Sequence, residues 1–154
     1  MFDEDFDPGL ARLVAAHPAM FRGGSPAVTS HVPPGWYELV DKLCEDIESA
    51  LDPAELERFE CRQIKEKFGT LRFYWRYGTS IRPRVDLLST EEFVSFEALP
   101  PELDARMQML HELIDAACSA SGTICDTCGS LGRLLTVNGW WMTRCPEHTP
   151  DADE

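Results

Sequence analysis

The 154 residues suit one domain with at most a small appendage, and the hydrophobic content of 44% argues against a disordered chain. A formal net charge of -13 opposes general binding to duplex DNA or RNA, because the phosphates would meet a repulsive field. The chain contains no run of about 18 apolar residues, and its N-terminus MFDEDFDPG is acidic where a signal peptide would be basic, so we expect a cytoplasmic protein.

Helical patterns occupy three main segments of the chain. Asp7 and Pro8 match the N-cap and first position of a short helix, and apolar residues recur at helical spacing in two longer segments. Asp52 and Glu55 are spaced as a capping box for one further turn. The sequence therefore predicts helices over residues 8–16, 36–51 and 102–119, with a weaker one over 89–96.

Two strands are predicted over residues 58–67 and 70–77, which are rich in aromatic residues and roughly alternate in polarity. Phe68-Gly69 separates them, and Gly69 supplies the positive φ that a tight hairpin turn needs. The fold class that follows is α+β, with helices packed on a β-hairpin or small antiparallel sheet.

The C-terminal part carries a metal-binding pattern of two close ligand pairs. The candidate ligands are Cys125, Cys128, Cys145 and His148. Three thiolates and one imidazole fill all four positions of tetrahedral Zn²⁺, which is typical of a structural site that keeps no place for water. We therefore expect an α+β domain over residues 1–122 and a zinc-ribbon-like appendage over residues 123–150.

The insert between the two ligand pairs resembles a hairpin. Asn138-Gly139 is a strong turn signal, with apolar residues before it and Trp140 and Trp141 after it. If both tryptophans lie on a strand, they point to opposite faces. Either one packs on the metal or the main domain while the other is an exposed anchor, or both are buried.

The few positive charges of this acidic chain are concentrated in one segment. Between residues 58 and 84 there are eight cations and two acids, so the segment is +6 and the remainder is -19. A two-residue turn at Phe68-Gly69 predicts the cross-strand pairs Lys67–Thr70, Lys65–Arg72, Gln63–Tyr74 and Cys61–Arg76.

This register places one set of side chains on a single sheet face, which we call the basic hairpin face: Lys65, Lys67, Arg72, Tyr74 and Arg76. Like charges across a ladder destabilise it unless something neutralises them. Three answers stay open: the chain's own acids or water, an anionic small ligand such as a nucleotide or phosphate with a base stacked on Tyr74, or an acidic protein partner.

No catalytic motif is complete in the sequence. His111-Glu112 begins an HExxH pattern, but Asp115 occupies its fifth position, and no G-x-S-x-G or P-loop motif is present. We therefore expect a binding protein rather than an enzyme.

The segments HPAMFRG, GWYELVDKLCEDIE, QIKEKFGTLRFYW and ICDTCGSLGRL…GWWMTRCPEH occur in this order. With them the chain resembles, over roughly residues 17 to 148, a family of uncharacterised small proteins of bacteriophages and prophages. The resemblance rests on the KEKFGTLRFY box and the C-terminal Cys/His pairs. It implies expression in an infected bacterial cell and a zinc site, but it brings no activity. Residues 79–101 depart from the short connection that the resemblance implies.

The sequence thus leads to two hypotheses about function. The first is a phage-type accessory protein that is stabilised by structural zinc and binds a host or defence protein. The alternative is a protein that binds or sequesters a nucleotide or phosphate with its basic hairpin face.

Overall fold

The computed structural model describes residues 7–22, 30–78 and 101–151, with side chains from residue 104 onward in the last range. The expected helix over 89–96 and the cations Arg82 and Arg84 lie outside these residues. The elements in chain order are α1 (Pro8–Ala16), η1 (Pro18–Phe21), η2 (Pro34–Trp36), α2 (Tyr37–Ala50), α3 (Pro53–Leu56), β1 (Phe59–Lys67), β2 (Thr70–Tyr77), α4 (Pro101–Ser121), β3 (Arg133–Val137), β4 (Trp140–Arg144) and η3 (Pro146–His148).

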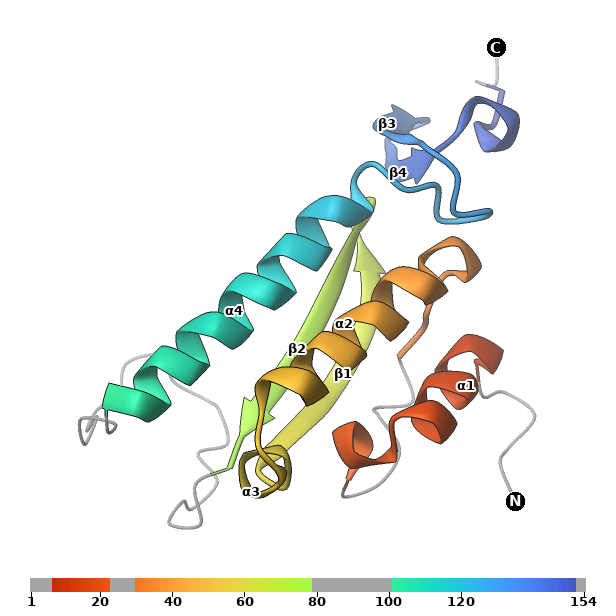
Figure 1. Cartoon of the computed structure of the whole chain (residues 1–154). Helices are drawn as coiled ribbons and strands as arrows, with labels where there is room; N and C mark the ends of the chain where they lie inside the picture. The colour runs from red at the N-terminus through yellow and green to blue at the C-terminus, as the bar shows by residue number, and fades with distance from the viewer. Residues whose placement is uncertain (1–6, 23–29, 79–100, 152–154) are drawn as a thin grey trace, which may run out of the picture.

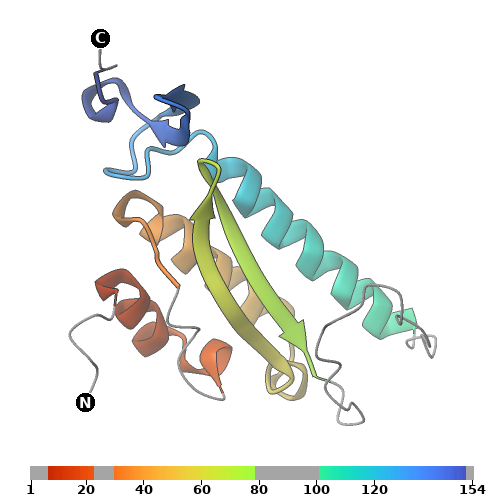
Figure 2. The ribbon, with the colours of Figure 1, turned by 180° about the vertical axis from the view of Figure 1, so that it is seen from behind.

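The fold is α+β, as the sequence predicts. The β1–β2 hairpin lies beside α2 and α4, and the β3–β4 hairpin follows α4 near the tip of the first hairpin (Figure 1). From behind, the β1–β2 hairpin presents a face that none of the described helices covers (Figure 2). No helix in the described residues is long and apolar enough to cross a membrane.

The local signals for helix starts and turns are confirmed. The Asp7 side chain accepts a hydrogen bond from the Leu10 N–H, and Asp52 and Glu55 form the complete capping box. Phe68 and Gly69 both adopt positive φ, at 54° and 81°, which is the combination of a type I′ turn. That turn fixes the predicted pairs of residues from Lys67–Thr70 back to Gln63–Tyr74.

One predicted pair is wrong, because β1 has an irregularity in its register between Cys61 and Gln63. Cys61 lies opposite Trp75 instead of Arg76, and it is buried, with 3% of its surface exposed. A bulge shifts the alternation of a strand by one residue. Here it places Cys61 in the core and brings Glu60 opposite Arg76 on the uncovered face.

The core lies between α2, α4 and the inner face of the β1–β2 hairpin. Trp36 is fully buried at the start of α2, with its indole N–H donating to the Ile124 carbonyl oxygen at 2.8 Å. The other buried side chains of this layer include Val40, Leu43, Ile47, Ile64, Leu71, Phe73, Leu110 and Ile114. Burial of one such side chain stabilises the fold by about 2 kcal/mol, so the three elements hold one another in place.

The N-terminal helix is tied to α2 through a buried histidine. His17, with 6% of its side chain exposed, lies 2.6 Å from Asp41 through Nε2 and 2.5 Å from Glu48 through Nδ1. Both ring nitrogens need a proton to donate to both carboxylates, so the arrangement favours the imidazolium. Burial by itself would lower the pKa of His17, but the hydrogen bonds to Asp41 and Glu48 raise it above 6.5.

We predict that the contribution of His17 to stability decreases as the pH rises. The pKa of His17 is raised in the folded state, so its stabilisation is complete below the unfolded pKa of about 6.5 and is lost as the pH passes through the folded pKa. The measurement is the difference in unfolding free energy between wild type and His17→Gln at several values from pH 6 to pH 9. A difference that stays constant or grows with pH would contradict this account.

Candidate metal centre

The C-terminal segment folds as the zinc-ribbon pattern predicts. Asn138 and Gly139 take positive φ in a second type I′ turn, which pairs β3 with β4 from Val137–Trp140 to Arg133–Arg144. Cys125 and Cys128 lie in a turn closed by the Gly129 N–H, which donates to the Cys125 carbonyl oxygen. The other ligand pair follows β4, at the start and end of η3.

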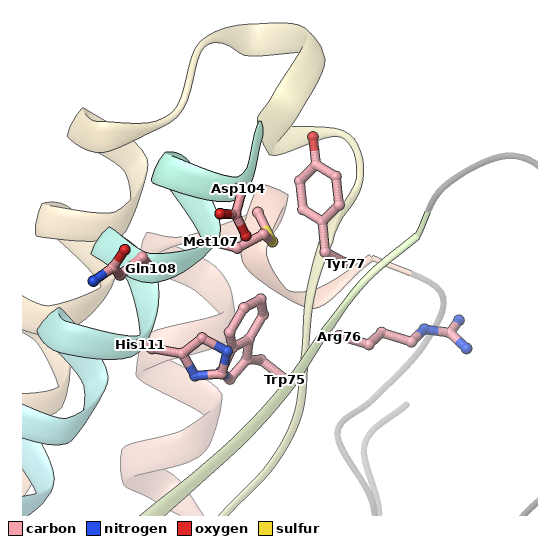
Figure 3. Close-up of a pocket in the computed structure, with 7 residues that line it drawn as sticks. All are labelled: Trp75, Arg76, Tyr77, Asp104, Met107, Gln108 and His111. Atoms are coloured by element: carbon pink, nitrogen blue, oxygen red, sulfur yellow. The ribbon is translucent and has the colours of Figure 1, made fainter. Parts of the chain in front are cut away.

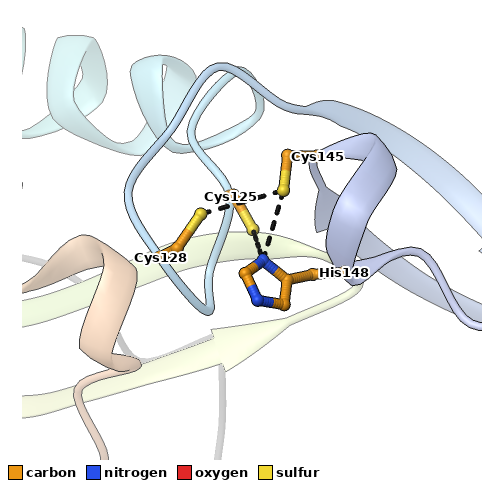
Figure 4. Close-up of side chains that lie close together, drawn as sticks. All are labelled: Cys125, Cys128, Cys145 and His148. Carbon is orange, nitrogen blue, oxygen red and sulfur yellow. Dashed lines mark hydrogen bonds between the residues drawn. The ribbon is translucent and has the colours of Figure 1, made fainter.

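The four candidate ligands converge on one point (Figure 4). Their ligand atoms all lie within 4.8 Å of one another. The Sγ atoms of Cys128 and Cys145 are 3.7 Å apart, and His148 Nδ1 lies 3.7 Å from Cys125 Sγ and 3.2 Å from Cys145 Sγ.

Two of these three separations match a tetrahedral metal site, and the third, from His148 Nδ1 to Cys145 Sγ, is shorter. Around Zn²⁺, with Zn–S near 2.3 Å and Zn–N near 2.1 Å, neighbouring ligand atoms would be about 3.5–3.8 Å apart. A disulfide would require sulfur atoms about 2.05 Å apart, and all six cysteines are free thiols. The cluster could therefore hold a metal ion such as zinc.

The surroundings favour the thiolate at two of the three cysteine ligands, Cys125 and Cys128, whereas burial raises the pKa of Cys145. Burial opposes ionisation of Cys125, but N–H groups of Cys145, Cys128 and Thr127 lower its pKa to about 6. The hydroxyl and N–H of Ser130 lower the pKa of Cys128. Because the thiolate is the form that binds a metal, these N–H groups prepare the site for a cation.

Arg144 connects the two ligand turns. Its Nη1 donates to the His148 carbonyl oxygen at 3.2 Å, and its Nε lies 2.6 Å from Asp126 Oδ1. The Nε–H does not point at the carboxylate, so this second contact is an ion pair without a hydrogen bond. Asp126 thus balances a cation beside the cluster.

Within the described residues, three hydrogen bonds between residues far apart in the sequence fix the ribbon to the main domain, in addition to its covalent link. The Gly35 N–H donates to the Asp126 carbonyl oxygen at 2.8 Å, next to the bond from Trp36 to Ile124. The buried Thr143 hydroxyl of β4 donates to the Gly69 carbonyl oxygen at 2.7 Å. The tip of the KEKFGT box therefore forms part of the surface to which the ribbon binds.

Two glycines make this close approach possible. A Cβ on Gly35 would lie 1.9 Å from the Cys125 carbonyl oxygen, and one on Gly69 would lie 2.4 Å from Leu134 Cδ1. Real Cβ atoms do not approach other heavy atoms so closely. A glycine is therefore required at position 35, because a side chain there would clash with the backbone of the Cys125–Cys128 turn.

The basic hairpin face is partly neutralised by the chain itself. Glu60, brought onto this face by the bulge, lies 2.7 Å from Arg76 and 3.3 Å from Arg62. Lys65 lies over the Tyr74 ring, with Nζ 5.5 Å from its centroid.

Among the described residues, no ion pair joins an acid of α2 to Lys65, Lys67 or Arg72. Asp41 and Glu48 bind His17 instead, and Asp46 pairs with Lys42. The shallow pocket at the far end of the hairpin includes Arg76 but none of the other four residues of the basic hairpin face, as Figure 3 shows. It is lined by Trp75, Arg76, Tyr77, Asp104, Met107, Gln108 and His111. This pocket therefore gives no support to a ligand site around Tyr74, and the small-ligand hypothesis stays a prediction.

The two ribbon tryptophans are both exposed, Trp140 by 75% and Trp141 by 49%, so the expectation that both are buried is wrong.

The contacts that Gly35, Trp36 and Thr143 make between the ribbon and the main domain were not predicted from the sequence. The available signal was the Pro-Pro-Gly-Trp stretch before α2, where a glycine precedes a large aromatic residue.

No protein-family model, curated protein or solved structure matches this chain.

We predict that Gly35→Ala separates the ribbon from the main domain. The added methyl group must displace backbone atoms, which we expect to cost about 3 kcal/mol of unfolding free energy and to reduce the bound metal. The matched control is Gly78→Ala, whose Cβ would have, among the described residues, only the Arg58 carbonyl oxygen nearby, at 3.8 Å. Urea unfolding and metal analysis of both variants test this, and equal stability of the two would contradict it.

Proposed function

We propose that the Cys125, Cys128, Cys145 and His148 cluster binds one structural Zn²⁺ that holds the ribbon against the main domain. The supporting observation is that four soft ligands at tetrahedral spacing fill the coordination sphere. A metal in such a site contributes to folding rather than to chemistry, because no position remains for water or substrate.

Protein purified without chelator is expected to contain about one equivalent of zinc. His148→Ala is expected to lower this value and the melting temperature, because three ligands cannot close the site. Cys118→Ser is the control, because Cys118 is a thiol outside the cluster. A content below about half an equivalent in the wild type, measured by elemental analysis, would refute the structural zinc.

We further infer that the chain is a phage-type accessory protein that binds a host or defence protein in the bacterial cytoplasm. One observation supports this proposal: large apolar side chains are exposed on both hairpins and on the loop between Cys128 and β3. They are Phe68, Leu131, Trp140 and Trp141. Exposed aromatic residues on a fixed scaffold are typical of interface anchors, because they bury a large area at little entropic cost. The resemblance to phage proteins implies expression in an infected bacterial cell, where host and defence proteins are the available partners.

A pull-down from bacterial lysate tests the binding proposal. The tagged, zinc-loaded chain is expected to retain a defined host protein, and Trp140→Ala with Trp141→Ala is expected to lose most of it, because the aromatic anchors are removed. The control is Met109→Ala, which removes an exposed apolar side chain from α4. Recovery of no protein above background, or equal recovery by both variants, would contradict the proposal.

A further inference from the structure

Phe68 occupies a position that the turn itself does not favour. It has φ 54°, a conformation that is sterically costly for a bulky L-residue, and 64% of its surface is exposed. The second hairpin of the chain uses Asn138-Gly139 for the same turn, the preferred pair. Folding therefore gains little from Phe68, and a strained, exposed aromatic residue points to a role in binding.

Three cations near this tip have no acidic partner among the described residues. Lys65 and Arg72 face each other across the ladder, and Lys67 lies over the Phe68 ring, with Nζ 5.4 Å from its centroid. The recorded ion pairs of the hairpin involve Glu60 with Arg62 and Arg76, farther from the tip. Within the described residues, no ion pair neutralises Lys65, Lys67 or Arg72 at the tip.

The ribbon adds apolar surface to the same place. Leu134 packs against Gly69, since its Cδ1 would lie 2.4 Å from a Cβ there. Trp141 lies on the same face of the ribbon as Leu134 and Thr143, because Trp141 and Thr143 are two apart on β4 and Thr143 pairs with Leu134. Leu134 and Trp141 are both partly exposed. Leu134 and Trp141 thus lie on the ribbon face that contacts the tip of the β1–β2 hairpin, where Phe68 precedes Gly69 in the turn.

We propose that this tip surface, formed by Phe68, Lys65, Lys67, Arg72, Leu134 and Trp141, binds an acidic segment of a partner protein. The apolar side chains receive an aromatic or aliphatic residue of that segment, and the three cations pair with its carboxylates. A short acidic peptide matches the limited extent of the positive charge. A long nucleic-acid strand would extend past it onto a chain whose net charge is -13. This inference rests on the proposed binding function and specifies its site and the chemistry of its partner.

The test uses a displayed library of random 12-residue peptides, selected on the zinc-loaded full-length chain. The enriched peptides are expected to carry at least three Asp or Glu residues around an aromatic residue or leucine. Their affinity is expected to fall with added salt, because the contacts are partly ionic. Selection that enriches no acidic peptide would overturn the inference.

Variants then locate the binding site of the selected peptide. Phe68→Asn is expected to weaken binding at least tenfold and also to raise the melting temperature, since asparagine tolerates positive φ. This pair of effects separates a role in binding from a role in folding. Arg72→Glu is expected to weaken binding by a similar factor, whereas Lys42→Ala, on the exposed side of α2, leaves it unchanged.

Three further results would overturn the inference. The first is an affinity of Phe68→Asn within twofold of the wild type, and the second is equal or stronger competition by a twelve-residue oligo-dT, which would indicate single-stranded nucleic acid. The third is a host protein, recovered by pull-down, whose binding Phe68→Asn leaves unchanged. In that case the proposed function stands and only this site fails. If neither a peptide nor a host protein binds, the proposed function fails as well.

Discussion

The close contact between the ribbon and two glycine-containing turns determines how the whole molecule is assembled. Gly35 allows the backbone of the Cys125–Cys128 turn to pass directly over the start of α2, and Gly69 allows Leu134 to reach the tip of the β1–β2 hairpin. The buried bonds from Trp36 to Ile124 and from Thr143 to Gly69 stabilise these contacts. Because the ribbon has few buried apolar residues of its own, its position depends on this contact and on the ligand cluster.

The distribution of charge follows from the same assembly. The carboxylates of this acidic chain neutralise cations locally: Asp41 and Glu48 bind His17, Glu60 binds Arg76, and Asp126 balances Arg144 beside the cluster. These pairs hold α1, the bulged strand and the ligand turns in place. None of these ion pairs involves the hairpin tip, where Lys65 and Lys67 lie over the exposed rings of Tyr74 and Phe68.

Much of this could be predicted from the sequence, where a local pattern determines the structure. The capping box at Asp52, the turn at Phe68-Gly69 and the spacing of the four metal ligands each depend on residues close in the chain. The bulge after Cys61 could not be predicted, because the preference of Cys61 for the core, rather than a turn signal, shifts the register. The Pro-Pro-Gly-Trp stretch draws attention to Gly35, but the segment that Gly35 contacts could not be predicted, because it is about ninety residues away in the sequence.

The claim that a bound metal holds the ribbon on the main domain is tested most directly by amide hydrogen exchange, with and without chelator. The Gly35 amide is informative because it donates to the Asp126 carbonyl oxygen within the contact itself. We expect removal of the metal to abolish the protection of Gly35 while the amides of α2 stay protected, since the core does not depend on the ribbon's ligands. Slow exchange at Gly35 that is the same with and without metal would contradict the account.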